Sequence, residues 1–210
     1  GIADGDAVEL SNLNRQILHA STRIGKNKAC SAAETIQEWN LEVQVSVIPE
    51  FLQDENILPL IRQYDFVVDA SDQLQNKFLI NDSCVTAGIP FCHGGIEGWD
   101  GQVMTYLPKQ NLPCYRCVFE SLPADQESKP IGVIGVTAGI IGTIQASEAI
   151  RYLLGEQDGL LKGTLLRFSG QTMQFRKIPL GKCAPHCPVC HGVPDANPLQ
   201  WYQKFRNHKK

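Results

Sequence analysis

Four cysteines form two closely spaced pairs, Cys114 with Cys117 and Cys187 with Cys190, and two residues separate the members of each pair. Each pair can present two thiolates to one ion from a tight turn, and four thiolates complete the tetrahedral shell of a structural zinc ion. The pairs lie too far apart in the sequence for a zinc finger. We therefore predict a structural Zn²⁺ that pins the C-terminal part of the chain to the domain and leaves no open position for catalysis.

The alternative is two unrelated pairs, one of them a redox motif. A redox C-x-x-C pair usually lies at the start of a helix that follows a strand, and it functions without a second pair. Zinc is therefore the preferred interpretation. Cys183, His186 and His191 flank the second pair and can compete as ligands, but we interpret them as bystanders. The remaining cysteines are interpreted as small buried hydrophobic residues: Cys30, Cys84 and Cys92.

Charged residues in the first 28 positions are suited to binding a nucleotide. Asp4 ends a short apolar segment, and an acidic residue at the carboxyl end of a strand typically binds ribose hydroxyls. Arg15 lies in the polar string Ser-Asn-Leu-Asn-Arg-Gln at 11–16, and Lys28 lies at the start of a predicted helix, where free N–H groups favour phosphate. Taken singly, Asp4 also fits an ordinary turn, and either cation also fits a solvated surface.

Asp72 follows the apolar segment 65–70, at the sheet edge where open α/β proteins bind ligands. A lone carboxylate at that place suits Mg²⁺ bound to phosphates. The alternative role is the N-cap of the following helix, which Ser71 or Asp72 can fill equally well. The residues alone leave both interpretations open.

The elements that must position these residues alternate between strands and helices over the first hundred residues. Strands are predicted at 1–4, 43–47, 65–70 and 89–93, and helices at 21–40, 57–61 and 74–87. This alternation predicts an α/β fold with a doubly wound, mostly parallel, Rossmann-like sheet. A helix at 140–154 and closely spaced strands at 102–107, 165–168 and 173–178 add an antiparallel C-terminal extension.

The composition excludes several classes of protein. The 210 residues are 43% hydrophobic and 20% charged, which suits one globular domain and excludes a disordered chain. A net charge of −3 argues against a nucleic-acid binder. Segment 131–147 is uncharged but rich in glycine, so we predict a buried loop-to-helix segment and no membrane span. No secretory signal is visible, which favours a cytoplasmic protein with reduced cysteines.

Together these segments resemble the MoeB/ThiF/HesA family, the bacterial relatives of ubiquitin-activating enzymes. The resemblance rests on Asp-Gly-Asp at 4–6, the string at 11–16, Gly-Lys-Asn-Lys at 25–28, Asp-Ala-Ser-Asp at 69–72, the glycine-rich segment 139–146 and both cysteine pairs in order. It covers residues 1–192, which we interpret as one adenylation domain. Residues 193–210 are interpreted as a basic, mobile tail.

The resemblance implies ATP-dependent adenylation of the C-terminal glycine of a small ubiquitin-like sulfur-carrier protein ending in Gly-Gly, with release of pyrophosphate. It implies that Asp4 holds the ribose and that Arg15 and Lys28, with Asn12 beside them, grip the phosphates. It also implies that Asp72 holds Mg²⁺, that the four cysteines bind zinc, and that the chain forms a homodimer. Which carrier and pathway the chain serves, thiamin, molybdopterin or another, stays open.

The chain departs from the family pattern in three ways. The family's first strand and glycine-rich phosphate loop would precede residue 1, so we expect this chain alone to adenylate poorly or not at all. The alternative function is a non-catalytic partner subunit that docks a carrier or a homologue.

Segment 118–134 lacks the cysteine of some members, which predicts adenylation with sulfur supplied by another protein. Gln73 and Lys77 stand where an Asn and an Arg are usual, and lysine lacks the bidentate fork of arginine.

Overall fold

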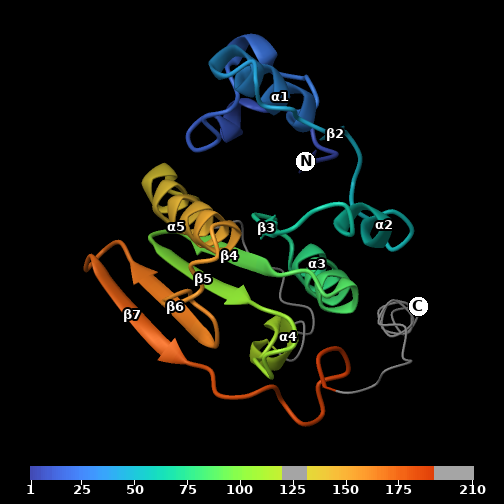
Figure 1. Cartoon of the computed structure of the whole chain (residues 1–210). Coiled ribbons are helices and arrows are strands. Elements are labelled where there is room, and N and C mark those ends of the chain that lie inside the picture. Colours follow the sequence, from blue (N-terminus) through green and yellow to red (C-terminus); the bar gives the residue numbers. More distant parts are fainter. Residues whose placement is uncertain (120–131, 192–210) are drawn as a thin grey trace, which may run out of the picture. The chain divides into compact units, whose positions relative to one another are not determined.

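The computed structural model describes residues 1–119 and 132–191, which form two compact units (Figure 1). The first unit holds residues 1–53 together with 134–136, and the second unit holds the rest. The phosphate-binding candidates Arg15 and Lys28 belong to the first unit. Asp72 and the four paired cysteines belong to the second, so each group is described within its own unit.

The first unit contains strand β1 (Ile2–Ala3), the 3₁₀ turns η1 (Leu10–Asn12) and η2 (Ser21–Arg23), helix α1 (Lys28–Trp39) and strand β2 (Val47–Ile48). The two strands pair in parallel. The helix begins later than residue 21 because Gly25 adopts a positive φ of 86°, and Asn27 then caps α1 by accepting a hydrogen bond from the Cys30 amide. Of the strand predicted at 43–47, only Val47 lies in an observed strand, β2.

The backbone places the start of α1 against the segment that follows β1. Val8 donates to the carbonyl of Lys26 and accepts from Gly25, and the Lys28 amide donates to the carbonyl of Asp6, each at 2.8 Å. This short antiparallel contact fixes Lys28 beside the residues that follow Asp4. The local position of Lys28 is therefore set by the main chain.

The second unit is built on a five-stranded sheet of order β3-β4-β5-β6-β7. Its strands are β3 (Val67–Asp69), β4 (Phe91–Glu97), β5 (Asp100–Tyr106), β6 (Thr164–Ser169) and β7 (Gln174–Pro179). The β3–β4 pairing is parallel, and the three remaining pairings are antiparallel. The mixed α/β fold and its antiparallel extension are confirmed, but the antiparallel share is larger than predicted because β4 turns back directly into β5 at Gly98, whose φ is +56°.

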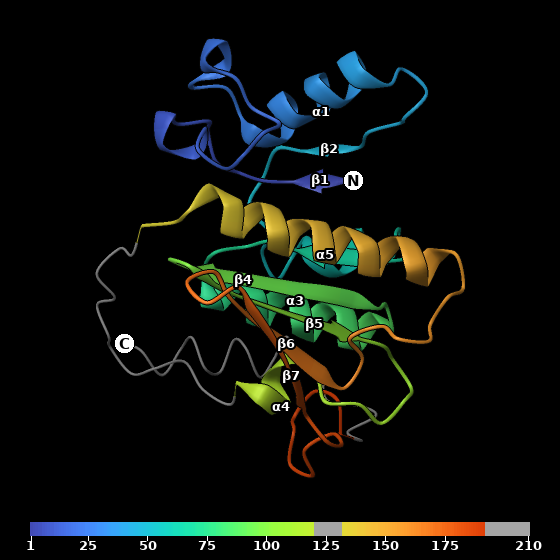
Figure 2. The ribbon, with the colours of Figure 1, turned by 90° about the vertical axis from the view of Figure 1, so that its left-hand side faces the viewer.

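Helices cover both faces of this sheet. The second unit contains α2 (Ile57–Ile61), α3 (Leu74–Ala87), α4 (Tyr115–Val118) and most of α5 (Gly135–Leu153). Figures 1 and 2 show α3 on one face and α5 on the other. On the α5 face, Ile141 packs with Cys92 and Val103 in the core. Cys84 and Cys92 are fully buried, as predicted, whereas Cys30 is only half-buried.

Helix α3 matches its predicted range and ends at Gly88, which adopts a left-handed φ of 68°. The glycines of α5 differ among themselves: a Cβ added at Gly135 would lie 2.1 Å from the carbonyl oxygen of Asn14, whereas one added at Gly139 or Gly142 would meet no atom within 4 Å among the described residues. No helix in the described ranges has the length and hydropathy to cross a membrane. The predicted tail 193–210 and most of the cysteine-free segment 118–134 lie outside the described residues.

Candidate functional site

The polar string 11–16 folds as a compact turn around Asn12. The Asn12 side-chain oxygen accepts a hydrogen bond from the Glu9 amide at 3.0 Å, and its backbone carbonyl accepts from Arg15 and Gln16. Asn12 is buried, with an exposed fraction of 7%. Its side-chain oxygen therefore shapes the turn that carries Arg15.

Arg15 is half-buried, and its side-chain hydrogen bonds come from a single nitrogen of the guanidinium group. Its Nη1 donates to the carbonyl of Ser11 and to Oδ1 of Asn14, both at 3.0 Å. Across the described part of the chain, no hydrogen bond is recorded for Nε or Nη2 of Arg15. One nitrogen thus fixes the guanidinium group, and two N–H-bearing nitrogens stay available for an anion.

Lys28 is the first residue of α1, and its ammonium group already has a carboxylate partner. Nζ lies 2.9 Å from Oδ2 of Asp6, and the Lys28 side chain is 12% exposed. Asp4 is close to the same pair, because its Oδ1 accepts from the Asp6 amide and its carbonyl accepts from the Asn27 side chain, each at 2.9 Å. No role was predicted for Asp6 from the sequence, where its only signal was the Asp-Gly-Asp spacing at 4–6.

His19 is a second residue near this group that the sequence analysis missed. Its Nδ1 lies 3.0 Å from the hydroxyl of Ser31, a fully buried residue of α1. Burial and then the positive charge of Lys28 lower the pKa of His19 below its usual range, although Asp4 acts in the opposite direction. The imidazole is therefore neutral at pH 7.

In the second unit, the loop after β3 leaves Asp72 exposed. The N-cap position of α3 is Gln73, and no side chain caps the helix. This excludes the helix-cap interpretation of Ser71 and Asp72. Ser71 instead donates from its amide and hydroxyl to Oδ1 of Asp69, at 3.0 and 2.6 Å, so the loop turns around a buried carboxylate.

Asp69 belongs to a buried polar network that joins β3, β4 and α3. Its Oδ2 lies 2.9 Å from Nδ1 of His93 and 3.9 Å from Nζ of Lys77, and all three side chains are at most 7% exposed. Burial alone would raise the pKa of Asp69, but the hydrogen bond from His93 and the Lys77 charge hold it below its usual range. Burial lowers the pKa of His93, so the neutral ring donates through Nδ1.

Lys77 holds the Asp72 loop from the helix side. Its Nζ donates to the carbonyl of Ser71 and, at 2.9 Å, to the carbonyl of Gly94. The side chain of Lys77, which stands where the family usually has an arginine, therefore points into the protein interior. It supports the loop that carries Asp72 through two main-chain contacts.

Replacing Lys77 with methionine is expected to lower the free energy of unfolding by about 2 kcal/mol, because two carbonyls lose their donor and Asp69 loses a charge partner. Lys77→Arg, which keeps the charge, is the matched control and should lose less. Urea unfolding at pH 7 measures both. Equal stability of Lys77→Met and the parent chain would show that this network does not hold the loop.

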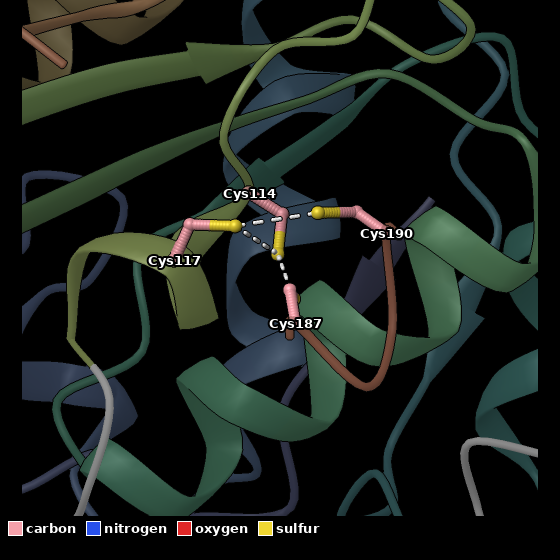
Figure 3. A group of neighbouring side chains, drawn as sticks. All are labelled: Cys114, Cys117, Cys187 and Cys190. Carbon is pink, nitrogen blue, oxygen red and sulfur yellow. Dashed lines mark hydrogen bonds between the residues drawn. The ribbon is translucent and has the colours of Figure 1, made fainter. Parts of the chain in front are cut away.

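The four paired cysteines meet in one cluster, as predicted. Their Sγ atoms all lie within 4.8 Å of one another. Sγ of Cys114 is 3.9 Å from that of Cys117 and 3.7 Å from that of Cys187, and Sγ of Cys117 is 3.3 Å from that of Cys190. Figure 3 shows Cys114, just before α4, and Cys117 on α4 facing the second pair on a loop.

The chemistry of these thiols fits a divalent cation. Hydrogen bonds from Cys114 lower the pKa of Cys117 and lower that of Cys187 to about 6, which favours thiolates. The pKa values of Cys114 and Cys190 are raised, mainly through the hydrogen bonds each shares with its neighbours. Four neighbouring thiolates repel one another unless a cation lies between them, and a bound metal deprotonates its thiols outright.

The two residues between the first pair anchor it to α3. The Tyr115 amide donates to Oδ1 of Asn81 at 2.8 Å. Arg116 makes two 2.6 Å hydrogen bonds to the carboxylate of Asp82, and its guanidinium lies 4.5 Å from the centre of the Phe78 ring. A bidentate ion pair of this kind fixes the direction of α4 as well as its position.

Residues 1–189 match the ThiF family. The chain belongs to the ThiF family. It is 38% identical over 212 residues to "Adenylyltransferase and sulfurtransferase MOCS3" of Culex quinquefasciatus, covering 100% of this chain and 48% of that protein. It is also 38% identical to "Sulfur carrier protein adenylyltransferase" of Thermus thermophilus, covering 98% of this chain and 78% of that protein.

The ThiF chain spans about half the length of the MOCS3 relatives, as the 49% coverage of the Dictyostelium discoideum protein also shows. Among solved structures, Escherichia coli MccB with MccA-N7isoASN gives a TM-score of 0.77 at 20% identity, over 90% of this chain and 59% of that one. The same protein with ATP gives 0.77 at 21% identity. These likenesses establish a shared fold.

Breaking the Asp82–Arg116 pair is expected to destabilise the ThiF chain strongly. Arg116→Met leaves Asp82 as a buried charge without its bidentate partner, a change that typically costs about 3–5 kcal/mol. Urea unfolding of this variant, with Arg62→Met on the exposed end of α2 as control, measures the loss. A loss below about 1 kcal/mol would mean that the pair does not anchor α4.

Proposed function

We propose that this ThiF-family chain uses ATP to adenylate the C-terminal glycine of a small ubiquitin-like sulfur-carrier protein. The observation that carries the proposal is the 38% identity, over 98% of this chain, to a protein named for sulfur-carrier adenylation. The cations and carboxylates described above give it a chemical basis.

The proposed reaction joins the carrier's terminal carboxylate to the α-phosphorus of ATP. One carboxylate oxygen forms the new P–O bond, and the bond between the α-phosphorus and the bridging oxygen breaks, so pyrophosphate leaves with the electron pair. The terminal carboxylate is already ionised at pH 7, so no general base is needed. The protein must position two anions and stabilise the charge that develops on the phosphates.

The available nitrogens of Arg15 and the ammonium group of Lys28 are proposed to hold the phosphates, with Asn12 maintaining the Arg15 turn. Asp4 is proposed to hold the ribose. Lys28 then exchanges its partner Asp6 for phosphate, or shares the two. Both cations come from the first unit, where the fold holds each by at least one hydrogen bond.

Asp72, in the loop after β3, is proposed to hold Mg²⁺. A single exposed carboxylate fits this ion, because Mg²⁺ usually keeps several waters and takes only one or two protein carboxylates beside phosphate oxygens. When bound, the ion would neutralise phosphate charge. Zn²⁺ is proposed for the four-cysteine cluster, in a structural role.

The proposal also includes a homodimer in the cytoplasm, with sulfur supplied by another protein. The side chains of Ile150 and Leu153 on α5 are 57% and 59% exposed, which supports a partner surface on that helix. The carrier's identity is to be found among ubiquitin-like proteins of the source genome that end in Gly-Gly.

Carrier-dependent exchange of labelled pyrophosphate into ATP tests the function. The complete gene product that carries this sequence is assayed with each such carrier and with the same carrier lacking its last glycine. Exchange that needs ATP, Mg²⁺ and the intact carrier terminus is expected. Carrier binding without any exchange would refute the adenylation proposal and identify a non-catalytic partner subunit.

A further inference from the structure

A fifth cysteine lies against the four-cysteine cluster. The Sγ atom of Cys183 is 3.0 Å from that of Cys190, which is shorter than the 3.3 Å between Cys190 and its partner Cys117. Cys183 is buried, with an exposed fraction of 8%. Cys183 was predicted to be a bystander, and the structure places it in contact with a predicted metal ligand.

The backbone holds Cys183 beside the first cysteine pair. Its amide donates to the carbonyl of Asn111 at 3.2 Å, and the next amide, that of Ala184, lies 3.4 Å from Sγ of Cys117. Cys187 in turn donates to the carbonyl of Ala184 at 3.0 Å. Segment 183–187 is therefore tied both to α4 and to the second pair, which keeps the Cys183 thiol at the cluster.

We propose that Cys183 is a reserve ligand of the metal centre, able to take the place of Cys190 on the ion. The two sulfur atoms lie 3.0 Å apart, so the Cys183 thiol lies next to the position that Cys190 would leave. Cys183 loses its proton on binding and the released Cys190 thiolate gains one, so the ion keeps four thiolates and the site keeps its charge. The inference rests on the proposed metal site and is independent of adenylation.

His191 is the competing candidate for the same role. Its Nδ1 lies 3.8 Å from Sγ of Cys183, so an imidazole also borders the cluster. A thiolate is favoured because the three remaining ligands are thiolates and soft sulfur ligands suit zinc well. Co²⁺ distinguishes the two, since its sulfur-to-metal charge-transfer absorption scales with the number of bound thiolates.

Titration of the apoprotein with Co²⁺ tests the proposal. Cys190→Ser is expected to bind one equivalent with the four-thiolate absorption of the parent chain. Cys190→Ser combined with Cys183→Ser should bind at least 100-fold more weakly. Cys114→Ser is the matched control, because among the described residues the Cys183 thiol borders Cys190 and His191 and makes no hydrogen bond with Cys114, and it should lose a thiolate without replacement.

If Cys190→Ser matches Cys114→Ser, or shows a three-thiolate spectrum, the proposal is wrong.

A second measurement avoids variants that fail to fold: the zinc-loaded parent chain is treated with iodoacetamide and the labelled cysteines are mapped. Labelling divided between Cys183 and Cys190 is expected, with the other three ligands protected. Labelling of Cys183 alone within the cluster would contradict exchange, and a parent chain that binds no metal would overturn both the metal site and this inference.

Discussion

Removal of the bound metal is expected to lower the free energy of unfolding by at least about 4 kcal/mol, the stabilisation that a ligand gives at a thousandfold excess over its dissociation constant. The cluster joins α4 to the segment around Cys187 and Cys190, which is distant in sequence. The described cysteines form no disulfide that could replace this link. The measurement is urea unfolding of the zinc-loaded protein before and after treatment with a chelator.

Specificity distinguishes a structural ion from adventitious binding. Zn²⁺ should restore the original unfolding curve, and Mg²⁺ should not, because thiolates are poor ligands for a hard cation. Cys30→Ser is the control for thiol loss elsewhere, since Cys30 lies on α1 in the first unit and outside the cluster. An unfolding curve that the chelator leaves unchanged would show that the cysteines hold no stabilising metal.

Replacing Lys28 with methionine is expected to lower the rate of carrier-dependent pyrophosphate exchange about 10²- to 10³-fold, the usual effect of removing one group that stabilises developing charge. Methionine keeps the length of the side chain and removes the ammonium group at the start of α1. The matched control is Lys26→Met, two residues away, whose lysine pairs with Glu34 on the protein surface. The control should retain most of the exchange rate.

Stability measurements separate this effect from damage to the fold. The Lys28–Asp6 ion pair involves an aspartate that is 55% exposed, and pairs this open to solvent contribute at most about 1 kcal/mol. Lys28→Met should therefore unfold close to the parent chain while losing exchange. Retained exchange in Lys28→Met, or an equal loss in Lys26→Met, would contradict the proposed role of Lys28.

Elements were predicted well where a residue with a special backbone conformation ends them. Gly88 can adopt the left-handed conformation that ends α3, and that helix was predicted to its exact bounds. The start of α1 was predicted too early, because the apolar spacing that indicated the helix begins only at Ala29 and does not mark where the helix starts. In the structure Gly25 adopts a positive φ and Asn27 caps the helix. The β4–β5 hairpin was also missed, so the length of β4 and the antiparallel share of the sheet were underestimated.

The part of the candidate site that was predictable is the metal site, whose ligands are closely spaced in the sequence. Two residues between cysteines indicated a metal ligand pair, and the structure brings both pairs together. The partners of His93 and Arg116 were not predictable, because Asp69–His93 and Asp82–Arg116 join residues 24 and 34 positions apart on different elements. Such pairs arise from tertiary packing, and neither residue shows a local signal for its partner.

The most direct test of the account is the intact mass of the carrier after incubation with the complete gene product, ATP and Mg²⁺. An AMP group is expected on the carrier's C-terminal glycine, absent when that glycine is deleted and strongly reduced with Lys28→Met. A carrier that stays unmodified while the protein binds both it and ATP would rule out adenylation by this protein.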